Sequence, residues 1–140
     1  MLDRKALIGE LDIGDIFHAE YPNGAKCICL VLSVNDATIQ ARRVTSQESL
    51  EFDRQTGIEK ANGEEPLAVI NSVAPLPAEI HNVFLELDRK YAAVHGRDDI
   101  FERNPEYFKL TDAEKKAFRF IDKHYASNPL PTSSLVASTS

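Results

Sequence analysis

The chain of 140 residues contains no tryptophan, one methionine, two cysteines and six glycines. Its glycines are isolated from one another, so the sequence has no glycine-rich loop of the kind that cradles phosphate groups. The His-Glu-x-x-His zinc motif and the Gly-x-Ser-x-Gly nucleophile turn are also missing. No apolar run approaches the roughly 20 residues of a membrane-spanning helix. These absences exclude several large enzyme classes and predict no membrane association.

The composition that remains is that of an ordinary globular domain, with 43% hydrophobic and 27% charged residues. The formal net charge of −6 argues against a broad phosphate-binding face, so we expect no strong binding of nucleic acid. The first residues are not followed by an apolar run of signal-peptide length. Cys27 and Cys29 are separated by one residue on a predicted strand, where a mutual disulfide is unfavourable. The sequence therefore predicts a cytoplasmic protein with reduced thiols.

The clearest turn signal is Pro22-Asn23-Gly24. Proline presets φ near about −65° and glycine accepts a positive φ, which together predict a three-residue hairpin loop. In that register Phe17 faces Cys29 and Glu20 faces Lys26, whereas a two-residue Asn-Gly turn would shift every pair by one. The strand after the turn is apolar on both faces, so both must be covered. One face carries Ile28, Leu30, Leu32 and Val34, and the other carries Cys27, Cys29 and Val31.

Further strands are predicted over residues 37–44, 47–52 and 67–73, and about five short strands indicate a small antiparallel SH3-like β-barrel or bent sheet. After Pro77 the apolar spacing becomes helical up to Val94, and we expect this helix to cover the strand face with Cys27, Cys29 and Val31. Thr111 and Glu114 form the capping box of a later helix.

The predicted class is therefore α+β, with two or three C-terminal α-helices after the barrel. We expect one domain over residues 1–126, β-rich over 13–74 and helical over 77–126. A Ser/Thr/Pro-rich tail is expected over 127–140. A short helical turn is also expected after Asn104-Pro105.

The candidate ligand-binding residues are Lys26, Arg42, Arg43 and Thr45. They can provide an anion or RNA contact at a barrel mouth, or they can form a solvated strand end on an acidic protein. Adjacent arginines on a strand point to opposite faces, so only one of them belongs to a given site. We interpret the two cysteines as buried apolar residues and expect no metal and no cofactor, because His18 lies on the opposite strand face in the predicted register.

Three segments resemble, in their order, the ribonuclease toxins of the PemK type: Gly14-Asp15-Ile16, the run 28–33, and Val44-Thr45-Ser46-Gln47. Those toxins are small barrels that open with a Gly-Asp-apolar strand. The resemblance covers about a third of the chain and implies a shared barrel style. Where that family typically has an arginine pair before the second strand, this chain has Ala25-Lys26.

The sequence predicts no catalytic cluster, and its helical region is rich in aromatic residues. The leading hypothesis is therefore a non-enzymatic β-barrel domain that acts in protein–protein interaction or assembly, with another protein or a second copy of the chain as its partner. The alternative is an RNA-binding or ribonuclease-like barrel that uses Lys26, Arg42, Arg43 and Thr45.

Overall fold

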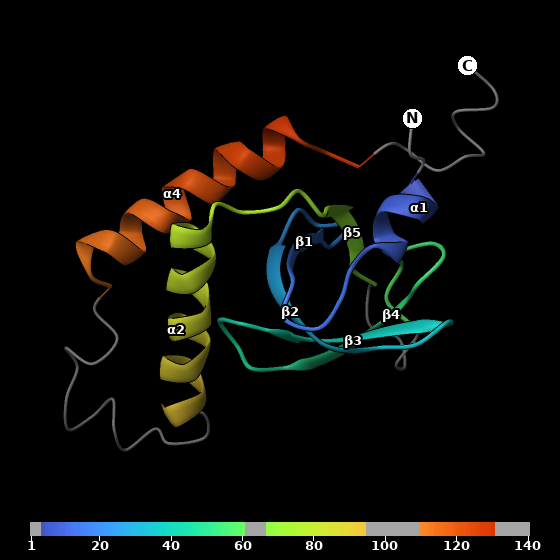
Figure 1. The fold of residues 1–140 in the computed structure, drawn as a ribbon, viewed down its shortest axis with the longest axis horizontal. Coiled ribbons are helices and arrows are strands. Elements are labelled where there is room, and N and C mark those ends of the chain that lie inside the picture. Colours follow the sequence, from blue (N-terminus) through green and yellow to red (C-terminus); the bar gives the residue numbers. More distant parts are fainter. Residues whose placement is uncertain (1–3, 61–66, 95–109, 131–140) are drawn as a thin grey trace.

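The computed structural model describes residues 4–60, 67–94 and 110–130. The elements in chain order are α1 (Arg4–Gly9), β1 (Ile16–Glu20), β2 (Lys26–Val34), β3 (Thr38–Arg43), β4 (Ser49–Asp53), β5 (Val69–Ser72), α2 (Ala78–Val94) and α4 (Asp112–Ser127). The strands form one strongly curled sheet, with α2 and α4 packed beside it and α1 at its other end (Figure 1). This arrangement confirms the predicted α+β class with a small barrel-like sheet followed by helices. Sequence reasoning did not predict α1.

All five strands are antiparallel to their neighbours, in the order β4-β3-β2-β1-β5. The predicted hairpin register is confirmed, because Phe17 pairs with Cys29 and Glu20 pairs with Lys26. Gly24 has φ of 90°, the left-handed conformation that the three-residue loop needs and that glycine adopts without steric cost. Strands β1 to β4 therefore pair in chain order, and β5 pairs with β1 on the side away from β2.

The concave face of the sheet encloses the first of two hydrophobic cores. Phe17 and Phe52 meet there edge to face, with ring centroids 5.4 Å apart. Small side chains alternate with these rings on the concave face, among them Ala19, Ala41 and Cys29. Small residues on the inner side let the sheet curl tightly without overpacking.

The second core lies on the convex face, under α2 and α4. Leu30 of β2 belongs to this core together with Phe84 and Leu87 of α2, whereas Cys29 belongs to the first. The expectation that α2 covers the cysteine-bearing face is therefore wrong. The curled sheet itself encloses that face, and the helices cover the opposite one. A two-residue period assigns residues to faces but does not indicate which face will be concave.

The capping box of α4 is confirmed, since Thr111 Oγ1 accepts from the Glu114 amide (3.1 Å) and Glu114 Oε1 accepts from the Thr111 amide (2.8 Å). The apolar stripe of α4 is buried at Ala117, Ile121 and Tyr125. Phe120, which falls off that stripe, stacks on His124 at 5.1 Å.

Beyond α4 the backbone amide of Leu130 donates to the carbonyl of Asn71 (2.7 Å), and the Leu130 side chain packs in the first core. The turn expected after Asn104-Pro105 and the residues from 131 onward lie outside the described residues. Within the described residues, no helix has the length and apolar character needed to cross a membrane.

Candidate functional site

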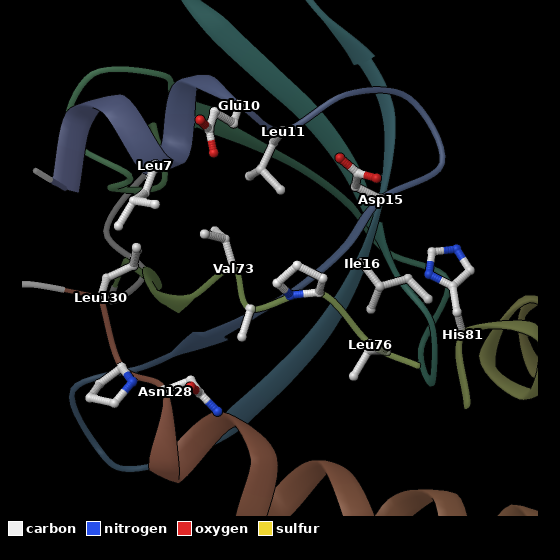
Figure 2. A pocket seen from close by; sticks show the side chains of 13 residues that line it. Leu7, Glu10, Leu11, Asp15, Ile16, Val73, Leu76, His81, Asn128 and Leu130 are labelled. Carbon is white, nitrogen blue, oxygen red and sulfur yellow. The ribbon is translucent and has the colours of Figure 1, made fainter. Parts of the chain in front are cut away.

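A large cavity, with a volume of about 540 Å³, opens to the surface beside the sheet. Three segments that are distant in sequence line it: the stretch from α1 to the start of β1, the link from β5 into α2, and the residues after α4. Figure 2 shows side chains from these segments arranged around one shared space. The cavity therefore exists only when the sheet, α1 and the end of α4 are assembled.

Aliphatic side chains make up most of the wall. Leu7 and Leu11 contribute from α1 and its following turn, Val73 and Leu76 from the link after β5, and Leu130 from the segment after α4. Leu7 lies in α1 and Leu11 lies just after it, and both side chains pack in or against the first core. Such a wall can hold an apolar group and exclude water from it.

Hydrogen bonds to the backbone hold the segments around the cavity in place. Ser72 Oγ donates to the Asn128 carbonyl (2.7 Å), which ties the end of β5 to the end of α4. His124 Nε2 donates to the Pro75 carbonyl (2.9 Å), which holds the link before α2. Arg54 Nη2 donates to the Gly9 carbonyl (2.9 Å) and so fixes the end of α1. The cavity thus has a preformed frame.

Two carboxylates and one imidazole stand among the lining residues: Glu10, Asp15 and His81. The Glu10 side chain is exposed and makes no hydrogen bond or ion pair with the described residues. Asp15 Oδ2 accepts from the Asp12 amide (2.8 Å), which closes the turn before β1. No lysine or arginine of the described residues lines the cavity, so the charged groups described on its rim are acidic.

A second, smaller cavity of about 280 Å³ lies between β1 and α4. His18 Nδ1 donates to Asn71 Oδ1 (2.5 Å), and Asn71 Nδ2 donates to Glu20 Oε2 (3.0 Å). The His18 ring packs against Tyr125, with centroids 5.2 Å apart. The Tyr125 hydroxyl is buried and has no hydrogen-bond partner among the described residues, and burial raises its pKa. The hydrogen bonds therefore join β1 to β5, and the contact with α4 is the packing of the His18 ring on Tyr125.

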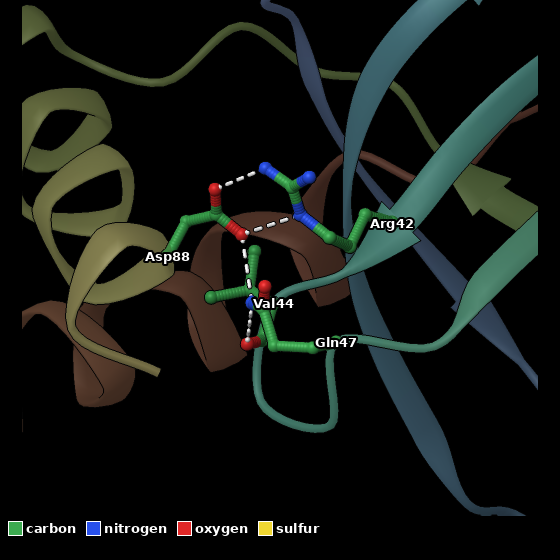
Figure 3. Close-up of polar contacts among 4 residues, drawn as sticks. All are labelled: Arg42, Val44, Gln47 and Asp88. Atoms are coloured by element: carbon green, nitrogen blue, oxygen red, sulfur yellow. Dashed lines mark hydrogen bonds and ion pairs between the residues drawn. The ribbon is translucent and has the colours of Figure 1, made fainter. Parts of the chain in front are cut away.

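Arg42, one of the predicted site residues, forms an ion pair with Asp88 of α2 (Figure 3). Its Nη2 and Nε donate to the two Asp88 carboxylate oxygens at 2.5 and 3.0 Å. Gln47 Nε2 donates to Asp88 Oδ1 (2.9 Å) and to the Val44 carbonyl (2.8 Å). The Asp88 side chain is only 7% exposed. The Arg42 guanidinium therefore connects the sheet to α2 and is already bound to Asp88.

The other predicted residues lie elsewhere on the surface. Arg43, on the opposite face of β3 from Arg42, donates through Nη2 to the Lys26 carbonyl (3.3 Å). Thr45 is exposed in the turn between β3 and β4. The structure brings Arg43 close to Lys26 and directs Arg42 toward α2.

The two cysteines are buried, unpaired thiols in the first core. Burial raises the pKa of Cys27 and raises that of Cys29 well above its usual value, so both are protonated at neutral pH. His18 contacts Tyr125 on the convex face, as the predicted register requires. Among the described residues, no three His, Cys, Asp or Glu side chains are placed to hold a metal ion.

Sequence reasoning did not predict the large cavity or the Asp88 ion pair. The i, i+4 spacing of Leu7 and Leu11 was the available signal for a short helix with an apolar side. The signal for the ion pair was Asp88 itself, because an acid four residues after Phe84 falls on the buried side of α2. Comparison with protein-family models, with curated proteins and with solved structures found no match to this chain.

Proposed function

We propose that this protein is a non-enzymatic interaction module, a small SH3-like barrel that binds a segment of a partner protein in its large cavity. The observation that carries the proposal is the open, aliphatic cavity of about 540 Å³ with an acidic rim. Concave, mostly apolar sites of about 300–1,000 Å³ with a few polar groups are typical ligand sites in proteins. The strand order, in which β5 returns to pair with β1, supports the SH3-like comparison.

The apolar side chains that line an open cavity gain free energy when a partner group covers them and excludes water. Residues from α1, the link after β5 and the segment after α4 all contribute, so a partner segment would contact several elements at once. The free, buried thiols are compatible with action in the cytoplasm, which we include in the proposal. A second copy of the chain is the alternative partner.

Filling the cavity should weaken partner binding without unfolding the protein. Ala74 is half-buried and lines the cavity, so Ala74→Phe places a ring in the space that a partner side chain would enter. We expect peptides selected from a random display library on the full chain to bind Ala74→Phe at least about tenfold more weakly, a loss of about 1.4 kcal/mol. Fluorescence anisotropy measures the affinities.

The matched control is Ala113→Phe, which adds the same ring at an exposed position in the first turn of α4. This variant should bind the selected peptides like the parent protein. Circular dichroism should show both variants folded. Equal affinity of the parent and Ala74→Phe for the selected peptides, or a library that yields no enriched peptide, would count against the proposal.

The alternative function, RNA binding or cleavage, is favoured by one observation, the proximity of Arg43 to Lys26. Residues 1–76 nevertheless hold seven Lys and Arg against twelve Asp and Glu. Phosphate binding requires several clustered cations. We therefore expect single-stranded RNA to bind more weakly than micromolar, without sequence preference.

A titration at low salt tests this expectation under conditions that favour electrostatic binding. The informative variant is Arg43→Ala, because Arg42 already holds Asp88. Micromolar or tighter binding that is lost in Arg43→Ala would support the RNA-binding alternative. RNA cleavage that is abolished by Thr45→Ala would support the ribonuclease-like alternative.

A further inference from the structure

The chemistry of the large cavity defines its ligand more closely. We infer that it accepts an aliphatic side chain from a partner segment that carries a positive charge directly beside it, as a neighbouring lysine or arginine would supply. This inference rests on the proposed function, because it specifies which partner segment the interaction module selects. Two independent features of the cavity carry it, the aliphatic wall and the uncompensated acidic rim.

The wall favours an aliphatic occupant. In Figure 2, Leu7, Leu11, Val73 and Leu130 surround the space from different segments. Among the described residues no Phe, Tyr or Trp lines the cavity, and the imidazole of His81 is the single aromatic ring there. Burial of methylene groups against leucine and valine side chains is the main attraction that such a wall supplies.

The rim favours a cation. Glu10 and Asp15 lie at the two ends of the connection from α1 to β1, so they approach the cavity from one side. No lysine or arginine of the described residues forms an ion pair with either carboxylate. Arg54, the cation beside α1, donates to the Gly9 and Leu11 carbonyls and does not line the cavity.

The charges on the rim therefore discriminate between ligands with the same apolar part. An ammonium or guanidinium group next to the apolar anchor gains attraction from both carboxylates, whereas a carboxylate there is repelled. The formal net charge of −6 acts in the same direction during encounter with a basic segment. The imidazole of His81 is the remaining titratable group on the lining, contributed by the first turns of α2.

Three unbranched probes with six carbon atoms each test the inference: hexylammonium, 1-hexanol and hexanoate. Each is titrated into the full chain at low salt, and amide chemical shifts of Leu7 and Leu11 report binding in the cavity. We expect hexylammonium to bind most tightly and hexanoate least, with a ratio of roughly fivefold or more between them. Added salt should shrink this ratio, because it screens exposed charges.

The matched variants remove the rim charges and keep the shape. The double variant Glu10→Gln/Asp15→Asn should bind hexylammonium and hexanoate equally while its affinity for hexanol is unchanged. Asparagine at position 15 retains an oxygen that can accept from the Asp12 amide. The control is Asp36→Asn/Glu51→Gln, which alters the net charge equally at exposed positions outside the cavity and should keep the preference.

The outcomes separate this inference from the proposed function. If the parent protein binds hexylammonium and hexanoate equally, or keeps its preference in Glu10→Gln/Asp15→Asn, the inference is overturned. The proposed function would still be supported if peptides selected by display bind the parent protein and bind the Ala74→Phe variant more weakly. If none of the three probes binds, the inference is overturned as well. If the display selection also yields no binding peptide, the proposed function is overturned too.

Two other possible occupants of the cavity would give different experimental results. Probe binding that appears only after deletion of residues 131–140 would identify the chain's own C-terminal residues as the occupant. Concentration-dependent dimerisation that Ala74→Phe abolishes would identify a second copy of the chain. Either result would replace the partner segment inferred here.

Discussion

Leu87→Asp is expected to lower the free energy of unfolding by about 3–5 kcal/mol, the usual scale for an uncompensated buried charge. Leu87 is completely buried in the second core, between α2 and the convex face of the sheet. A carboxylate there would be surrounded by apolar groups such as Leu30 and Phe84, and the neighbouring Asp88 would add like-charge repulsion. The substitution therefore tests whether the helices are integral to the fold.

Urea and thermal unfolding, followed by circular dichroism, measure this effect. For a domain of this size the expected loss corresponds to a fall in Tm of at least about 10 °C. Arg89→Asp is the matched control, because it introduces the same side chain two positions later on the exposed side of α2. An unchanged Tm for Leu87→Asp would show that the second core does not hold α2 on the sheet.

Asp88→Ala should lower the free energy of unfolding by about 2–3 kcal/mol, the second largest effect that we expect. The substitution removes the acceptor of Arg42 and of Gln47 and leaves a half-buried guanidinium without its carboxylate. We place the cost below that of a fully buried pair, because the Arg42 side chain is 30% exposed and water can partly solvate it.

A double-mutant cycle with Arg42→Ala separates the ion pair from the packing of each side chain. The conservative double replacement Arg42→Met/Asp88→Leu should be far closer to the parent protein than Asp88→Ala, because it leaves no unpaired charge. Asp88→Asn should be intermediate, since an amide oxygen can still accept from Arg42. If Asp88→Ala and the double replacement unfold at the same urea concentration, the loss arises from packing and not from the charge.

Local rules explain which parts of the fold could be predicted from the sequence. Pro22-Asn23-Gly24 determines the hairpin register because turn geometry permits few alternatives, and Thr111 with Glu114 marks a helix start through two hydrogen bonds. The choice of concave face is a different kind of problem. Cys29 and Leu30 are neighbours with similar apolar character, and only closure of the whole sheet assigns one to each core.

The candidate site depends on such long-range closure even more strongly. Leu11 and Leu130 line the same cavity although nearly the whole chain separates them. Nothing in either local sequence indicates the other, so composition and periodicity could not predict the site. The four predicted residues were chosen because they are charged or polar at strand ends, a pattern that solvated surface positions share. Arg42 shows the ambiguity, since its partner is a buried acid on α2.

The connection between β4 and β5 has a consequence for self-association. Open sheet edges present unpaired amides and carbonyls, which template edge-to-edge polymerisation. Here Ile58 bridges to Val69 and Glu59 bridges to Phe52, so the connection occupies both edges of the curled sheet. The protein should therefore resist amyloid-like growth through its outer strands, and a partner should recognise side chains in preference to adding a strand of its own.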